Sequence, residues 1–193
     1  MMTSLPNIMT LGRIALIPLI ILLMYIPTAF TAWTALILYT IACVTDYLDG
    51  YLARRMDTVS DIGKFLDPIA DKIMVGSLLV ALAAIDRLDG VWVIPAIVIM
   101  VREFLVSGLR EYLGPKNVKL PVSGLAKWKT TIQMIAIGFL VIGPFGSTVL
   151  PFTLLIGQIG LTLAALITVV TGWNYLKAGL LHMSAPVESE REL

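Results

Sequence analysis

Four aspartates lie in a chain that is otherwise strongly apolar, within the stretch DYLDGYLARRMDTVSDIGKFLDPIADK at residues 46–72. Asp46 and Asp49 are three residues apart, and Asp67 and Asp71 are four apart. Residues at these spacings share one face of an α-helix. The sequence therefore predicts two consecutive helices, each carrying a pair of carboxylates, that meet across a short turn.

Four neighbouring carboxylates need positive charge close by. An ionisable group at the centre of a membrane helix costs about 2.5–3.5 kcal/mol, and packing like charges together adds repulsion. Arg54 and Lys72 could supply two positive charges, whereas two divalent cations would match all four aspartates. Oxygen ligands without nearby His or Cys favour Mg²⁺ or Mn²⁺ over Zn²⁺. A pair of such ions is an arrangement that enzymes use for displacement reactions at phosphorus. The alternative is that the aspartates have a structural role only, in a salt-bridge cluster between packed helices.

The composition places these aspartates in a membrane protein. Hydrophobic residues make up 58% of the 193 residues and charged residues only 14%, whereas soluble domains carry about a quarter charged residues. The net charge is +1 and Lys and Arg do not form runs, so no nucleic-acid partner is expected. The apolar stretch after Arg13 lacks small residues at a cleavage site, and we interpret it as a retained first helix.

The uncharged runs predict six membrane-crossing helices, because one crossing needs about 20 mostly apolar residues. The segments PTAFTA at 27–32 and GPFGS at 143–147 divide the two longest runs, since Pro and Gly interrupt helices. We expect a single all-α membrane domain over residues 1–183 and a polar tail over 184–193. The expected spans are about 8–27, 31–54, 63–86, 91–113, 122–143 and 148–177.

The basic residues predict how these helices are oriented. With six spans, both termini and the connections near 55–62 and 114–126 fall on one side. Of the 14 Lys and Arg residues, only Arg87 falls on the other side. Because Lys and Arg are enriched on the cytoplasmic side of membrane proteins, we expect the basic end, and the aspartates with it, to face the cytoplasm.

The aspartates also belong to a longer pattern. The motif D-x2-D-G-x2-A-R-x8-G-x3-D-x3-D resembles the signature of the CDP-alcohol phosphatidyltransferases. The resemblance implies a six-helix membrane enzyme, commonly a homodimer, that cleaves a CDP-linked lipid and passes its phosphatidyl group to an alcohol. All of the specified residues are present, at Asp46, Asp49, Gly50, Ala53, Arg54, Gly63, Asp67 and Asp71.

The resemblance further implies a role for each signature residue. The four aspartates are expected to bind two divalent cations, Mg²⁺ or Mn²⁺, and Asp71 is expected to act as the general base as well. The resemblance also implies that most of the signature residues contact the cytidine diphosphate part of the substrate. Its expected binding residues are Asp46, Asp49, Gly50, Ala53, Arg54, Gly63 and Asp67.

Three segments outside the signature resemble the bacterial members of the family that use sn-glycerol 3-phosphate as acceptor. They are LPNIMTLGRIALIP at 5–18, REFLVSGLRE at 102–111 and AKWKTTIQM at 126–134; Ala126 departs from the Gly expected there. A phosphorylated acceptor also agrees with the cations at the cytoplasmic helix ends, since a dianionic headgroup needs such partners. The predicted acceptor phosphate-binding residues are Arg102, Arg110, Lys127 and Lys129.

Other interpretations of these polar residues stay open. The four cations could be ordinary cytoplasmic anchors, and Glu103 and Glu111 could pair with them locally. Asn7, Thr10 and Arg13 share one face of the first helix. They could line the same cavity, or they could serve as capping or surface residues.

The sequence thus predicts an enzyme of the bacterial cytoplasmic membrane that transfers the phosphatidyl group of CDP-diacylglycerol to sn-glycerol 3-phosphate, giving phosphatidylglycerophosphate and CMP. The first alternative is the same donor chemistry with inositol phosphate, serine or phosphatidylglycerol as acceptor. An ion transporter is the second, because intramembrane aspartates also mark ion pathways, although here the acids gather at one end. A catalytically silent assembly subunit is the third.

Overall fold

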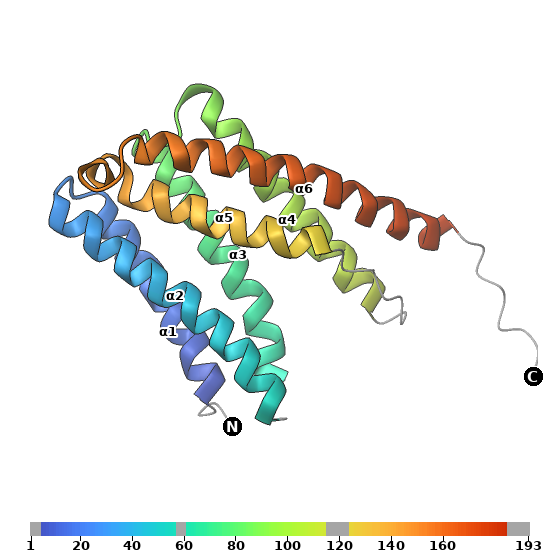
Figure 1. Cartoon of the computed structure of the whole chain (residues 1–193). Coiled ribbons are helices and arrows are strands. Elements are labelled where there is room, and N and C mark those ends of the chain that lie inside the picture. The colour runs from blue at the N-terminus through green and yellow to red at the C-terminus, as the bar shows by residue number, and fades with distance from the viewer. Residues whose placement is uncertain (1–4, 57–60, 115–123, 185–193) are drawn as a thin grey trace, which may run out of the picture.

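The computed structural model describes residues 5–56, 61–114 and 124–184, and these form six α-helices (Figure 1). This number agrees with the sequence-based expectation. The last helix continues seven residues past the expected end at 177, so the chain is helical up to residue 184. The helices are α1 Leu5–Met24, α2 Ala29–Met56, α3 Asp61–Ala84, α4 Val93–Leu113, α5 Gly124–Ile142 and α6 Thr153–Ser184, with short 3₁₀ segments η1 Gly90–Trp92 and η3 Gly143–Thr148.

Successive helices run in alternate directions, so the bundle has two kinds of end. We call the end that holds the first residues of α1, α3 and α5 and the last residues of α2, α4 and α6 the open end, because the helices spread apart there (Figure 1). At the opposite, closed end the short connections gather. α1 packs on α2 and α3, α5 packs between α2 and α6, and α4 packs mainly on α6. α3 and α4 make few contacts although they follow each other in the chain.

The apolar core joins all six helices. Close approach of α5 and α6 depends on two glycines, because a Cβ at Gly157 would lie 2.8 Å from a Leu140 side-chain carbon and one at Gly160 would lie 3.1 Å from Ala136. Small residues at helix contacts are the usual means of tight packing in membrane proteins. Fully buried core residues include Ile20, Met74, Leu78, Leu82, Ile99, Ile137, Leu140 and Leu161.

The closed end is held together by Arg87, a buried residue between α3 and α4. Its Nη1 donates to the carbonyl oxygens of Leu140, at 2.9 Å, and Val141. These carbonyls belong to the last turn of α5, where a cation also interacts favourably with the helix dipole. Burial lowers the pKa of Arg87 from its usual value, but a guanidinium stays protonated in proteins. Gly143 has a φ of +56°, and a Cβ there would lie 2.8 Å from Arg87 Nε.

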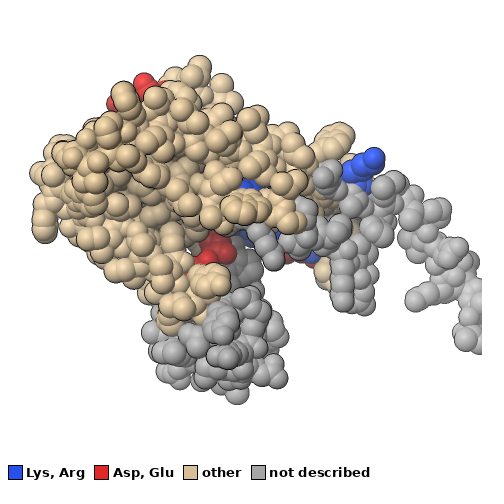
Figure 2. Space-filling model, in the orientation of Figure 1, with Lys and Arg blue, Asp and Glu red and all other residues tan. Residues whose placement is uncertain are grey.

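Few charged side chains appear on the face of the bundle in Figure 2, and many large apolar side chains are exposed on the described helices, which suits a membrane environment. Side chains that are half or more exposed include Leu22, Ile37, Ile97, Leu163, Leu166 and Val170. By length and composition, α1 offers only the shorter apolar stretch Met9–Met24, and α3 does not qualify within the described residues. The four helical stretches that are long and apolar enough to cross a membrane are Ala29–Leu48, Gly90–Leu113, Trp128–Thr148 and Thr153–Lys177.

Candidate active site

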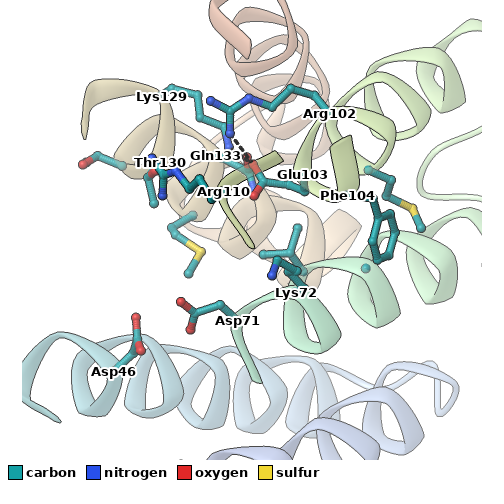
Figure 3. A pocket seen from close by; sticks show the side chains of 15 residues that line it. Asp46, Asp71, Lys72, Arg102, Glu103, Phe104, Arg110, Lys129, Thr130 and Gln133 are labelled. Atoms are coloured by element: carbon teal, nitrogen blue, oxygen red, sulfur yellow. Dashed lines mark hydrogen bonds and ion pairs between the residues drawn. The ribbon is translucent and has the colours of Figure 1, made fainter. Parts of the chain in front are cut away.

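A cavity of about 530 Å³ opens between α2, α3, α4 and α5 at the open end (Figure 3). A volume of this size suits a small molecule or the headgroup of a larger one. Acidic residues of α2 and α3 form one wall, and a mostly cationic cluster from α4 and α5 forms the opposite wall. The charged residues that line it are Asp46, Asp71, Lys72, Arg102, Glu103, Arg110 and Lys129.

The acidic wall is organised by Arg13, which is 1% exposed and comes from α1. Its Nη1 lies 3.1 Å from Asp71 Oδ1 and also forms an ion pair with Asp46 Oδ1. A single nitrogen therefore holds carboxylates from two different helices. The Asp46 side chain is 33% exposed and the Asp71 side chain 53% exposed. Both carboxylates thus contact Arg13 on one side and remain accessible from the cavity.

The donor chemistry of this wall fits a hard divalent cation. Asp46 Oδ1 and Asp71 Oδ1 contact the same nitrogen of Arg13, so the two oxygens are close enough to share a cation. Mg²⁺ and Mn²⁺ prefer such oxygen ligands. Among the described side chains, no group of three or more His, Cys, Asp and Glu residues could hold a metal ion. The structure thus brings together two of the four expected ligands, Asp46 and Asp71. The side chains of the other two, Asp49 and Asp67, lie outside the described part.

The remaining signature residues belong to the same two helices. Asp49, Gly50, Ala53 and Arg54 lie in the last turns of α2, and Gly63 and Asp67 lie in the first turns of α3. These turns are at the open end of the bundle (Figure 1), and Asp46 and Asp71 of the same two helices line the cavity. Their side chains, like residues 57–60 between the helices, fall outside what the structure describes, so their expected contacts with cytidine diphosphate stay predictions.

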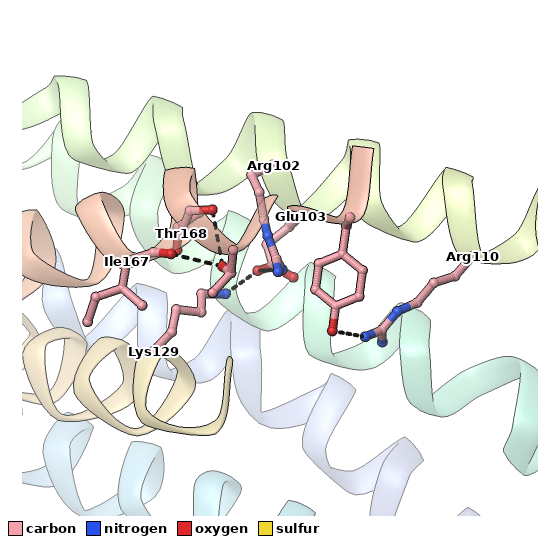
Figure 4. Close-up of polar contacts among 8 residues, drawn as sticks. Arg102, Glu103, Arg110, Lys129, Ile167 and Thr168 are labelled. Carbon is pink, nitrogen blue, oxygen red and sulfur yellow. Dashed lines mark hydrogen bonds and ion pairs between the residues drawn. The ribbon is translucent and has the colours of Figure 1, made fainter. Parts of the chain in front are cut away.

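On the opposite wall, Glu103 joins two of the predicted acceptor-binding cations (Figure 4). Its Oε1 accepts a hydrogen bond from Arg102 Nη1 at 3.2 Å and forms an ion pair with Lys129 Nζ. The Lys129 side chain is only 5% exposed, so this carboxylate provides the compensation that a buried ammonium requires. The local pairing that the sequence left open is therefore present for Glu103, and the three residues together carry a net charge of +1.

Arg110 lies two turns beyond Arg102 on α4, and its side chain is exposed to the cavity. Its Nη2 donates to the Tyr175 hydroxyl at 3.2 Å. Arg102, Arg110 and Lys129 therefore line one cavity together with Asp46 and Asp71. The fourth predicted member of the group, Lys127, has its side chain outside the described part of the chain.

Comparison with known proteins decides the family. The model of the family described as CDP-alcohol phosphatidyltransferase matches residues 3–173. The chain belongs to this family. Its similar relatives include proteins named CDP-diacylglycerol–glycerol-3-phosphate 3-phosphatidyltransferase from three bacteria: Rickettsia typhi, 45% identical over 92% of this chain and 97% of the relative; Bacillus subtilis, 40% over 90% and 94%; and Pseudomonas fluorescens, 37% over 98% and 97%.

Three residues of this phosphatidyltransferase that line the cavity or contact its walls were not assigned to the site from the sequence, although it left open that Arg13 lines the cavity. The sequence placed Arg13 on a polar face of the first helix. A stronger indication of its role was its charge, because a charged residue within so apolar a helix needs a buried partner. Gln133 lies one turn after Lys129, lines the cavity, and has a buried Oε1 without a hydrogen-bond partner in the structure. Tyr175 is separated by 65 residues from Arg110, and no local pattern indicates that pairing.

Proposed function

We propose that this protein transfers the phosphatidyl group of CDP-diacylglycerol to sn-glycerol 3-phosphate, giving phosphatidylglycerophosphate and CMP. Relatives that cover nine-tenths or more of the chain carry the name of this reaction. The observation that carries the proposal is a single cavity with a carboxylate wall and a mostly cationic wall. The first suits a metal-bound diphosphate, and the second suits a phosphorylated acceptor.

The reaction takes place at the membrane surface in this proposal. Residues 1–183 form one domain whose six helices cross the bacterial cytoplasmic membrane, with the open end facing the cytoplasm, and the protein is a homodimer. Four helical stretches have the length and composition for crossing. Arg87 is the only basic residue at the closed end, whereas the charged cavity lies at the open end, an asymmetry that agrees with the positive-inside rule.

The carboxylate wall binds the donor. Asp46, Asp49, Asp67 and Asp71 would hold two Mg²⁺ or Mn²⁺ ions, which when bound neutralise the diphosphate and stabilise the departing CMP. Gly50, Ala53 and Gly63 leave room for the nucleotide next to the helix backbones, and Arg54 offers a bidentate partner for phosphate. Arg13 fixes Asp46 and Asp71 relative to each other from behind.

Asp71 performs the proton transfer. Its half-exposed carboxylate accepts the proton from the attacking hydroxyl of the acceptor. The acceptor oxygen bonds to the phosphorus of the phosphatidyl group, the bond from that phosphorus to the oxygen of the CMP phosphate breaks, and CMP leaves. We favour this direct displacement over a phosphatidyl-aspartate intermediate, because the acceptor and the donor bind to opposite walls of one cavity.

The cationic wall binds the acceptor phosphate through Arg102, Arg110, Lys127 and Lys129. Of the described members, Arg102 and Lys129 share the charge of Glu103. With Arg110 added, the described cluster has a net charge of +2, which matches a dianionic phosphate monoester. A neutral or zwitterionic acceptor such as serine does not bring the two net negative charges that would balance this cluster.

An acceptor panel with purified protein in detergent tests this proposal. CMP release from CDP-diacylglycerol is measured with sn-glycerol 3-phosphate, inositol phosphate, serine or phosphatidylglycerol, with and without Mg²⁺ or Mn²⁺. We expect metal-dependent CMP release with glycerol 3-phosphate and the appearance of phosphatidylglycerophosphate as lipid product. Faster release with another acceptor would assign the protein to that acceptor, and labelled protein accompanying CMP release without acceptor would reverse the choice of direct displacement.

A further inference from the structure

Tyr175 of α6 lies between the two arginines of the cationic wall. Its side chain is buried, at 3% exposure, and packs with Val106, Leu109 and Leu113 of α4. The guanidinium carbon of Arg102 is 5.5 Å from the ring centroid and that of Arg110 is 5.2 Å from it. These are cation–π distances. The phenol also accepts the hydrogen bond from Arg110 Nη2 at 3.2 Å.

Two glycines on the same face of α6 explain why the ring reaches this position. Gly172 and Gly179 flank Tyr175 at helical spacings of three and four residues. A Cβ at Gly172 would lie 2.9 Å from Arg102 Cγ, and one at Gly179 would lie 2.6 Å from Leu109 Cδ1. The backbones of α4 and α6 therefore approach closely on both sides of Tyr175, and its ring fills the space between two arginines that are two helical turns apart.

The two arginines depend on Tyr175 to different degrees. Arg102 also contacts Glu103, so its guanidinium has an ionic partner of its own. The Arg110 side chain contacts Tyr175 twice, once through the hydroxyl and once through the ring. An exposed arginine without such contacts loses rotamer entropy when a ligand orders it. Contacts that order the side chain in advance reduce that cost of binding.

We propose that Tyr175 is a positioning residue for acceptor recognition: it holds the Arg110 guanidinium at the cavity, ready to bind the phosphate of the acceptor. This inference rests on the proposed function, because it deepens the role of the cationic wall. Tyr175 itself does not touch the reacting atoms. Its contribution is to the binding of the acceptor rather than to the chemical step.

Steady-state kinetics of Tyr175→Phe provide the test. The variant keeps the ring and its packing but lacks the hydroxyl, so only the hydrogen bond to Arg110 is lost. We expect KM for glycerol 3-phosphate to rise about 3- to 10-fold, since hydrogen bonds to charged groups are stronger than neutral ones but water replaces part of this one. The kcat and the KM for CDP-diacylglycerol should stay within about twofold, as expected when only uniform binding of one substrate is weakened.

Two further variants separate positioning from a general structural effect. Tyr39→Phe is a matched control, because Tyr39 is also buried and its hydroxyl donates to the Met134 carbonyl at 2.8 Å; it should lower thermal stability without changing KM for glycerol 3-phosphate. Arg110→Gln should raise that KM more than Tyr175→Phe. Adding Tyr175→Phe to Arg110→Gln should produce little further change, because the hydroxyl acts through Arg110.

The possible results distinguish this inference from the proposed function. If Arg110→Gln raises KM for glycerol 3-phosphate and Tyr175→Phe does not, or if the two effects multiply in the double variant, the positioning role is overturned while the proposed function stands. If the wild-type protein does not use glycerol 3-phosphate, the proposed function fails first.

Discussion

Two buried arginines hold the two ends of this bundle, and they do so with different partners. At the closed end, Arg87 donates to backbone carbonyls of α5, which are neutral and fixed by the helix itself. At the open end, Arg13 pairs with Asp46 and Asp71, whose carboxylates are still accessible from a cavity. Arg87 therefore caps the last turn of a helix, whereas Arg13 holds two carboxylates that can also bind a ligand from the cavity.

The difference shows how one residue type serves stability in one place and a site in another. The Arg87 contacts cannot be replaced by a ligand, because the connection around Gly143 packs directly against the guanidinium. The Arg13 contacts leave part of each carboxylate exposed to a space of about 530 Å³. Substitutions at the closed end should therefore change stability with little effect on catalysis, and substitutions at the open end should do the opposite.

The largest effect is expected at Asp71. Asp71→Asn removes the proposed base and should lower kcat about 10²- to 10⁴-fold, while metal-dependent binding of a cytidine nucleotide is largely retained. Asp46→Ala, measured in parallel by nucleotide titration in the presence of Mn²⁺, should lose that binding as well. Near-normal turnover of Asp71→Asn would rule out the assignment of the base.

The second-largest effect is expected at Arg87, at the closed end of the bundle. Arg87→Met leaves the carbonyls of Leu140 and Val141 without their donor in a buried place, which should lower the free energy of unfolding by about 2–4 kcal/mol. Thermal melting in detergent measures the loss. KM values and kcat of the folded fraction should match the wild type, and a selective loss of kcat at unchanged melting temperature would contradict the comparison between the two arginines.

Arg13→Met is expected to show the opposite behaviour. Residues that orient metal-binding or catalytic groups typically contribute about 10- to 100-fold to metal affinity or activity. The affinity for Mn²⁺ and kcat should therefore each decrease by about 10- to 100-fold. The melting temperature should change less than in Arg87→Met, because Asp46 and Asp71 are partly exposed to water. Arg13→Lys, which keeps the charge without the guanidinium, serves as the matched control for charge alone.

The smallest effect is expected for Gly143→Ala. The residue has a φ of +56°, and the added Cβ would lie 2.8 Å from Arg87 Nε, so we expect a loss of about 1–3 kcal/mol in stability. Gly108→Ala on α4 is the control, since a Cβ there meets nothing within 4 Å. Equal melting temperatures for the two variants would show that the turn does not depend on Gly143.

Much of the helical framework could be predicted from the sequence. The uncharged runs and the Pro- and Gly-containing segments indicated six helices, and the described helices begin and end within a few residues of most expected limits. The segment at 143–147 was expected to break the pattern, and it forms η3 before α6 begins at Thr153. Such features depend on residues that are neighbours in the chain, which is why local patterns reveal them.

The site could be predicted only in part. The spacing of the aspartates and the basic residues at 102, 110 and 129 were visible, and the structure places Asp46, Asp71 and these cations around one cavity. The local pairing of Glu103 was left open, and the ion pairs of Arg13 and the position of Tyr175 were not assigned. The contacts that were not assigned join residues far apart in the chain: Arg13 and Asp71 are separated by 58 positions, and Arg110 and Tyr175 by 65.

The amino-acid sequence by itself determined that this chain is an all-helical, apolar protein with its acidic and basic residues in a few fixed spacings, and with the motif that led to its family. Helical periodicity is a local property, so it indicates which residues share a face. The tertiary structure decided which faces meet: α1 brings Arg13 behind the aspartates, and α6 brings Tyr175 between two arginines. Those choices depend on how glycines and side chains pack between helices, and no spacing within one helix contains that information.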